Sequence, residues 1–470
     1  MHIVKRILAI CLSLSILMMT CARAEIDFLV HSKDFDWQST PVKVWIKAAV
    51  EKHMPFDDER FATLKPLLDM MSIQLVTGED SGLVTIFIDE YEALSLQQQD
   101  NLVRLSTMQD TVFTAQNDPV SMLLGEDVSI ASGYDALGMS EEGESLITHG
   151  AALINALPDA LSKYGKRSTN TTNIVGYGKA AYRIDYTIQA NKSQDFHQIL
   201  LAHCPEGWLN RILSSIAFSG KRTLRMYFTA EDVLLRAEYN GACGPEGDVR
   251  TVKLIFKCQY TDTFRKDYVE LTSPAKKGNN KNNLTFERVI QMNDQGHCAV
   301  EGNFTYSVIH DGISDIRKGA FDLINACTEN ADVITGSLTL ENKLNDAEKY
   351  SALTVIPNLS ISVADSLPCI NGTLTITEQY AGKTTEHAVL TIDLQPAEQL
   401  QWQSADLVTD LDALSADALI DIQQDVAMSV ATAIVHPLIL MLGADAQYFF
   451  RELPEDAVQN ILDAAEMSAN

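Results

Sequence analysis

The chain has 470 residues, of which 46% are hydrophobic and 21% charged, and its formal net charge is −27 at pH 7. This composition is typical of a folded globular protein and argues against an intrinsically disordered chain. The length predicts two or three domains with ample material for a core. Because so acidic a protein repels phosphate backbones, nucleic-acid binding is not expected.

The first 24 residues have the pattern of a secretory signal peptide. Lys5 and Arg6 precede an apolar run, Ile7–Met19, and Ala22-Arg23-Ala24 fits the small-x-small cleavage rule. We therefore predict cleavage after Ala24 and a protein that is secreted or held in the cell envelope. The apolar run is too short to span a bilayer, so no integral membrane span is expected after cleavage.

Cys21 offers a second interpretation, a lipidated N-terminal cysteine. Thr20 stands where a lipoprotein signal would have Gly, Ala or Ser, and we therefore favour cleavage after Ala24. The signal holds three basic residues and no acidic one, so the remaining chain would carry 33 basic against 63 acidic residues, a net charge of −30. This acidity favours solubility outside the cell.

Residues 25–168 are predicted to form an N-terminal region of helices and strands. A helix is expected to begin at Pro41, with Val42, Trp45, Ile46 and Ala49 on one face, and a second helix is expected over Asp57–Met71. Five strands should follow, at Ile73–Val76, Leu83–Ile88, Ala93–Gln98, Asn101–Leu105 and Thr111–Thr114. Pro119–Tyr164 then returns to helical spacing. A Ser/Thr/Asn linker at Ser168–Asn173 marks the predicted boundary.

Residues 169–400 are predicted to form a large antiparallel β-meander with an inserted pair of helices. From Arg222 to Leu394, apolar and polar residues alternate in segment after segment, which is typical of strands with one buried and one solvated face. Ser193–Ser219 has helical spacing and is broken into two helices at Pro205-Glu206-Gly207. We expect helices to cover the apolar face. The residues predicted to line this face and to contact a ligand are Phe256, Phe304, Tyr306 and Leu390.

Residues 401–470 are predicted to form a helical C-terminal segment. Ser404–Val426 carries an apolar stripe, and Ala427–Leu442 is strongly apolar but short and interrupted by Pro437, which favours a buried helix over a membrane span. The predicted fold class is therefore α+β: a large curved antiparallel β-meander with inserted helices and a helical C-terminal segment.

No catalytic, metal-binding or cofactor-binding signature emerges. His203-Cys204 and His297-Cys298 are adjacent pairs, but adjacent side chains point in different directions on a helix or a strand, so neither pair can form an activating hydrogen bond. The sequence contains no H-E-x-x-H, G-x-S-x-G or C-x-x-C motif. We predict no cofactor, no metal and no catalytic residue.

The cysteines suggest a structural role. Six remain after signal cleavage, at 204, 243, 258, 298, 327 and 369, and an even number in an exported chain permits disulfides. A hairpin centred between Gly312 and Ile313 would set Cys298 opposite Cys327. We therefore predict a disulfide between these two residues.

Three hypotheses about function remain open. The first is an exported non-enzymatic protein whose sheet and helices bind an apolar ligand or a partner protein; a continuous apolar cavity of several hundred Å³ would support ligand binding. The second is a surface or scaffolding interaction module, which predicts an exposed apolar patch or an unpaired edge strand. The third is a hydrolase whose site assembles only in three dimensions, and His149, His197 and His387 are the histidines least explained by core packing.

Overall fold

The structure is a computed structural model. It describes residues 41–53, 65, 69–77, 81–99, 101–108, 111–115, 119–124, 153, 156–169, 171–204, 208–245, 249–274, 281–310, 313–343, 350–364, 367–397, 402 and 407–442. The predicted signal peptide lies outside these residues. The chain divides into two compact units. Unit 1 comprises residues 1–33, 137–356 and 378–383, and unit 2 comprises residues 34–136, 357–377 and 384–470.

The protein is mostly β, and the predicted α+β class is wrong. Twenty of the described strands belong to one mixed sheet, and only 20% of the structure is helical. The first error is at β1 (Val42–His53), where a helix was predicted. The apolar residues there also alternate, at Val42, Val44, Ile46 and Val50, and β-branched residues favour strands. β1 is held as a strand because it pairs along most of its length with β21 (Lys383–Pro396).

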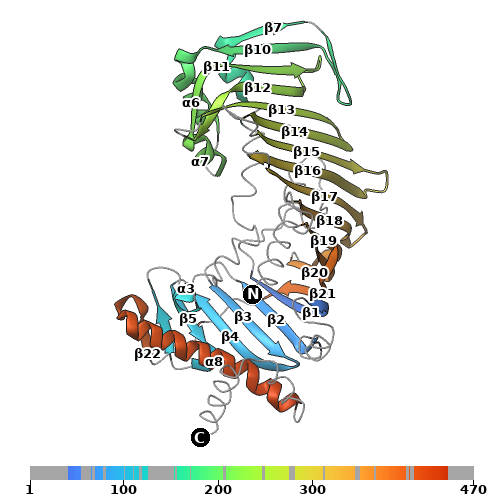
Figure 1. The fold of residues 1–470 in the computed structure, drawn as a ribbon. Coiled ribbons are helices and arrows are strands. Elements are labelled where there is room, and N and C mark those ends of the chain that lie inside the picture. Colours follow the sequence, from blue (N-terminus) through green and yellow to red (C-terminus); the bar gives the residue numbers. More distant parts are fainter. Residues whose placement is uncertain are drawn as a thin grey trace. The chain divides into compact units, whose positions relative to one another are not determined.

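Unit 1 is built on a ladder of long antiparallel strands that follow one another in chain order from β10 to β18 (Figure 1). The short strand β7 lies outside β10 and forms an edge. The strands are β7 (Gly165–Ser168), β10 (Tyr182–Ile188), β11 (Ile216–Phe228), β12 (Leu234–Pro245), β13 (Arg250–Thr261), β14 (Phe264–Pro274), β15 (Lys281–Met292), β16 (Cys298–His310), β17 (Ile313–Cys327) and β18 (Ala331–Lys343). The predicted meander is confirmed here, since each strand pairs with the next.

Helices cover one end of this ladder. The predicted pair is confirmed as α6 (Ser193–His203) and α7 (Trp208–Ser215), although β11 begins three residues before the predicted helical end at Ser219. Phe196 and Leu200 of α6 belong to one buried cluster with Leu224 and Met226 of β11. The single-turn helices η2 (Ser162–Tyr164) and η3 (Ala190–Lys192) precede α6 in the chain. The hairpin of β8 (Thr172–Ile174) and β9 (Gly178–Ala180) forms a separate small sheet.

Unit 2 confirms the five predicted N-terminal strands. They are β2 (Met71–Thr77), β3 (Ser81–Ile88), β4 (Tyr91–Gln99), β5 (Leu102–Leu105) and β6 (Thr111–Thr114), with η1 (Ser106–Met108) and α3 (Pro119–Leu124) after β5 and β6. Most of the second predicted helix lies outside the described residues. The strands β19 (Ser351–Ala364) and β20 (Leu367–Tyr380) have residues in both units.

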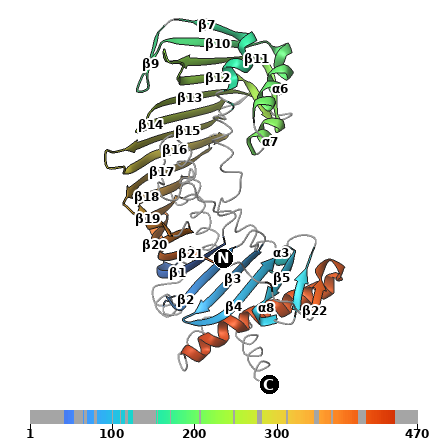
Figure 2. The ribbon, with the colours of Figure 1, turned by 180° about the vertical axis from the view of Figure 1, so that it is seen from behind.

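The C-terminal segment was predicted to be helical, but its described part contains a strand before the helix. β22 (Leu407–Asp410) pairs parallel with β6, η5 (Leu411–Ala413) follows, and only then does α8 (Ala416–Leu442) begin. α8 runs across the strands of this unit (Figure 2), and its Val426 is buried in a cluster with Leu94, Leu96 and Val103. Within the described helices, none combines the length and hydropathy needed to cross a bilayer.

Candidate functional site

Strand register gives the ladder of unit 1 two chemically different faces. Across β13–β18, two neighbouring rows of one face are apolar. The first row runs Leu254, Leu271, Leu284 and Tyr306, and the second runs Phe256, Val269, Phe286, Phe304, Gly319 and Leu340, each residue opposite the next. We call the nine large side chains of these rows the apolar patch: Leu254, Phe256, Val269, Leu271, Leu284, Phe286, Phe304, Tyr306 and Leu340.

The apolar patch is partly exposed to solvent. The exposed fraction is 37% for Leu254, 37% for Tyr306 and 44% for Leu340, whereas Leu224 and Met226, on the same face beneath the helices, are 6% and 1% exposed. At roughly 4.8 Å per strand, the second row extends about 24 Å across the sheet. Exposed apolar surface of this extent is typical of an interaction site.

Three of the four residues predicted to contact a ligand lie in this patch. Phe256, Phe304 and Tyr306 share the face, as their alternation indicated. Leu390 does not join them, because it lies in β21 of unit 2 and is 1% exposed. Alternation indicates which side chains share a face of one strand, but a period of two cannot show which strands form one compact unit.

Part of the patch is used for packing within the sheet, where aromatic rings lie over glycines of the neighbouring strand. Phe304 lies opposite Gly319, and a Cβ placed on Gly319 would be 2.0 Å from its ring. Phe321 covers Gly302 in the same way, with a ring atom 2.4 Å from the corresponding position. Aromatic rings that cover glycines in adjacent strands hold the sheet together locally. Phe304 is therefore a packing residue, and the free edges of the patch are at Leu254, Tyr306 and Leu340.

The row next to the patch contains a buried charge cluster. Asp267, 3% exposed, accepts hydrogen bonds from Arg265 Nε at 2.9 Å and from Arg288 Nη2 at 2.5 Å. Cys258 stands directly opposite Asp267, and burial, with the negative charge of Asp267, raises the pKa of its thiol to about 12. A thiol with so high a pKa is not nucleophilic at neutral pH. Because Arg265 and Arg288 both bond to the carboxylate of Asp267, we interpret the cluster as structural.

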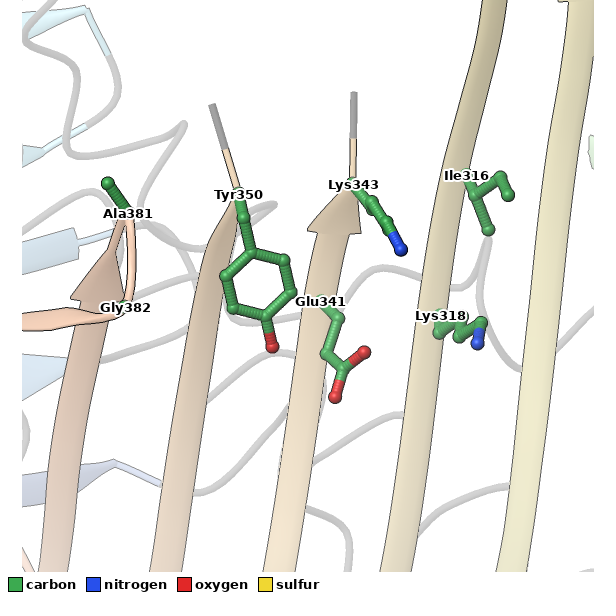
Figure 3. A pocket seen from close by; sticks show the side chains of 7 residues that line it. All are labelled: Ile316, Lys318, Glu341, Lys343, Tyr350, Ala381 and Gly382. Carbon is green, nitrogen blue, oxygen red and sulfur yellow. The ribbon is translucent and has the colours of Figure 1, made fainter. Parts of the chain in front are cut away.

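The opposite, polar face carries ion pairs and two open pockets. Asp185 lies between Arg183 and Arg225, at 2.9 and 3.2 Å, and Lys266 pairs with Glu287 at 3.0 Å. The larger pocket, about 460 Å³, is lined by Ile316, Lys318, Glu341, Lys343, Tyr350, Ala381 and Gly382. Figure 3 shows the Tyr350 hydroxyl pointing toward Glu341, and burial together with this carboxylate raises the pKa of Tyr350.

The second pocket, about 310 Å³, shares Lys318 and Glu341 with the first. Register places the side chains of Asn303, Thr305, Lys318 and Glu341 on the polar face. Neither pocket is the apolar cavity between sheet and helices that ligand binding in an enclosed site requires. Their mixed, shallow lining offers solvated charges rather than a shaped binding site.

Two of the three histidines of the hydrolase hypothesis make structural hydrogen bonds. His197 Nε2 lies 2.8 Å from the carbonyl oxygen of Leu213, and His387 Nδ1 lies 2.9 Å from Thr377 Oγ1. The first is in unit 1 and the second in unit 2, and His149 lies outside the described residues. Over the ranges that the structure describes, no three His, Cys, Asp or Glu side chains gather as a metal site would require.

The predicted Cys298–Cys327 disulfide is not formed. The register of the hairpin is centred one position earlier than expected, which shifts each cross-strand partner by two residues. Cys298 therefore lies opposite Asn325, and Cys327 lies opposite Asp332. The two cysteines are diagonal neighbours, whose Cα atoms lie roughly 7–8 Å apart in an antiparallel ladder, beyond the reach of a disulfide. No disulfide joins any of the six cysteines of the described chain.

Comparison with known proteins adds no family. No protein-family model matches the chain, and no curated protein or solved structure matches it significantly.

Proposed function

We propose that this chain is an exported, non-enzymatic scaffold whose apolar patch binds an amphipathic helix of a partner protein. The observation that carries the proposal is the change in exposure along one sheet face. Under α6 the face is buried, and at Leu254, Tyr306 and Leu340 it is more than one third exposed.

The protein's own packing supports a helix as the occupant. In unit 1, α6 packs its apolar side chains on this same face, and in unit 2, α8 covers a second set of strands in the same manner. A row of about 24 Å matches roughly 16 helical residues, or four to five turns. An amphipathic helix in an apolar groove or on an apolar surface is a common mode of recognition.

The polar surroundings favour a partner with basic residues beside its apolar stripe. The net charge of −27 attracts cations and repels anionic surfaces, so electrostatics would speed encounter with a basic helix and discourage binding to an anionic lipid surface. Enclosed storage of an apolar ligand is less well supported, because the two pockets described above are open and lined largely by polar-face residues.

Site-specific photo-crosslinking of the full chain in its native host tests the proposal. A photoreactive residue would replace Tyr306, and a matched control would replace Thr305, whose side chain points to the opposite face of the same strand. We expect position 306 to give an adduct with one helical, amphipathic segment of another protein, identified by peptide mass spectrometry, and position 305 to give none.

Two outcomes would contradict the proposal. Adducts with lipid alone at position 306 would assign the patch to an apolar small molecule. Equal protein adducts at positions 305 and 306 would show that no partner binds specifically to the apolar face.

A further inference from the structure

Arg222 is a buried arginine at the helix-covered end of the apolar face. It is 1% exposed, and it lies opposite Ile188 of β10. The pairing of β11 with β12 is interrupted between Ser219 and Thr223, so the segment with Arg222 bulges out of register. Gly241 lies beneath it, and a Cβ there would be 2.6 Å from Arg222 Cβ. The bulge and the missing side chain together make room for the arginine.

The guanidinium has only part of its hydrogen-bonding capacity satisfied. Nη2 donates to Ser193 Oγ and to the carbonyl oxygen of Gly220, the latter at 3.0 Å. Nε and Nη1 are buried and have no hydrogen-bond partner. Buried polar groups are nearly always paired, so two orphaned donors on one cation demand an explanation.

Among the residues that the structure describes, no acidic side chain acts on this charge. The groups that act on Arg222 electrostatically are Tyr239 and Cys243, and burial raises the pKa of both, which keeps them neutral at physiological pH. The acidic residue in the first turn of α6, Asp195, pairs with Lys192 at 3.1 Å. Arg288 differs in this respect, because it is also buried but donates hydrogen bonds to the carboxylate of Asp267.

Aromatic packing compensates only in part. The guanidinium carbon lies 5.1 Å from the ring centre of Phe196 and 5.3 Å from that of Phe218. Cation–π contacts of this kind stabilise a cation, but they leave its N–H groups without acceptors. The buried hydroxyl of Tyr239 has no nitrogen or oxygen partner and bonds only to the side chain of Cys243. Two buried guanidinium nitrogens without acceptors and a positive charge thus lie together at the start of α6, whose dipole adds further positive potential.

We infer that Arg222, with Tyr239 beside it, forms an anion-binding site for a small oxyanion. A carboxylate, phosphate or sulfate group accepts two hydrogen bonds from an arginine in a planar, bidentate arrangement. The same chemistry could come from a free inorganic anion or from the carboxylate head group of an amphiphile. No motif in the sequence indicates this site, because Arg222 and Tyr239 meet only through the fold.

Calorimetric titration and thermal unfolding of the full chain with inorganic phosphate, sulfate and a long-chain fatty acid test this inference. Sodium chloride at equal ionic strength serves as the blank. We expect the wild type to bind at least one oxyanion and to unfold at a higher temperature in its presence. Arg222→Met should lower the affinity about tenfold or more, since a charged hydrogen-bonding partner is lost.

Two further variants keep the test valid if Arg222→Met folds poorly. Tyr239→Phe removes one hydroxyl and should lower the affinity about two- to tenfold. Arg225→Met removes an ion-paired arginine of the polar face and should leave anion binding unchanged. Binding of phosphate or sulfate would assign the site to a free oxyanion, and binding of the fatty acid alone would assign it to a head group. Absence of binding by all three probes, or equal binding by wild type and Arg222→Met, would overturn the inference.

Discussion

The two ends of one sheet face differ in a way that local sequence does not reveal. Leu224 and Met226 of β11 and Leu254 and Tyr306 of β13 and β16 are all apolar residues of alternating strands, and all point to the same side. The first pair is buried beneath α6 and the second is 37% exposed. The difference teaches that alternation predicts which face is apolar, whereas burial depends on which helix reaches that face.

The largest expected effect concerns the charge cluster beside the apolar patch. Asp267→Ala would leave Arg265 and Arg288 without their shared carboxylate, and removing one partner of a buried ion pair costs about 3–5 kcal/mol. The matched control is Asp185→Ala, which removes a carboxylate that also lies between two arginines but on the solvated polar face. Its cost should stay below about 1 kcal/mol. Urea unfolding measures both, and equal losses would contradict the distinction between buried and solvated clusters.

The comparison of the two ends can be tested with matched truncations. Met226→Ala creates a cavity beneath α6 and should lower the free energy of unfolding by about 2–5 kcal/mol. Leu340→Ala, in the exposed patch, should cost less than about 1 kcal/mol in the isolated protein. Denaturant midpoints of the purified variants give both values. A loss at Leu340 as large as that at Met226 would mean that the patch belongs to the core.

An intermediate effect is expected within the patch itself. Gly319→Ala places a methyl group where the ring of Phe304 now lies, so the ring must move, at a cost of about 1–3 kcal/mol. In the double variant with Phe304→Leu the two changes should not be additive, because the smaller side chain relieves the clash. A double-mutant cycle by thermal unfolding checks this expectation, and strict additivity would argue against the ring–glycine contact.

The smallest effect at neutral pH concerns the thiol of Cys258. Its pKa is raised to about 12 in the folded protein, from about 9 in the unfolded chain, so the protonated thiol is favoured by folding. The folded chain then holds more protons than the unfolded chain between these values, and this contribution to stability is present below pH 9 and is lost as the pH rises toward 12. Native-state alkylation at pH 8 with peptide mapping should leave Cys258 unmodified, whereas the unfolded protein should react there. Rapid native labelling of Cys258 would contradict its burial.

The sequence by itself determined the character of the β-meander. Alternation placed Phe256, Phe304 and Tyr306 on one face, and the break at residues 205–207 separated the two helices, because side-chain direction has a period of two in a strand and helix breakers act locally. The strands β2–β6 were found within two residues at each end for the same reason.

Only the tertiary structure decided the rest. β1 is a strand through its long pairing with β21, and the register of β16 and β17 is centred one position away from the predicted centre, which separates Cys298 from Cys327. The surroundings of Arg222 come from α6, β11 and β12 together. Pairing partners, turn positions and buried charges depend on contacts between residues distant in the chain, and such contacts leave no local pattern.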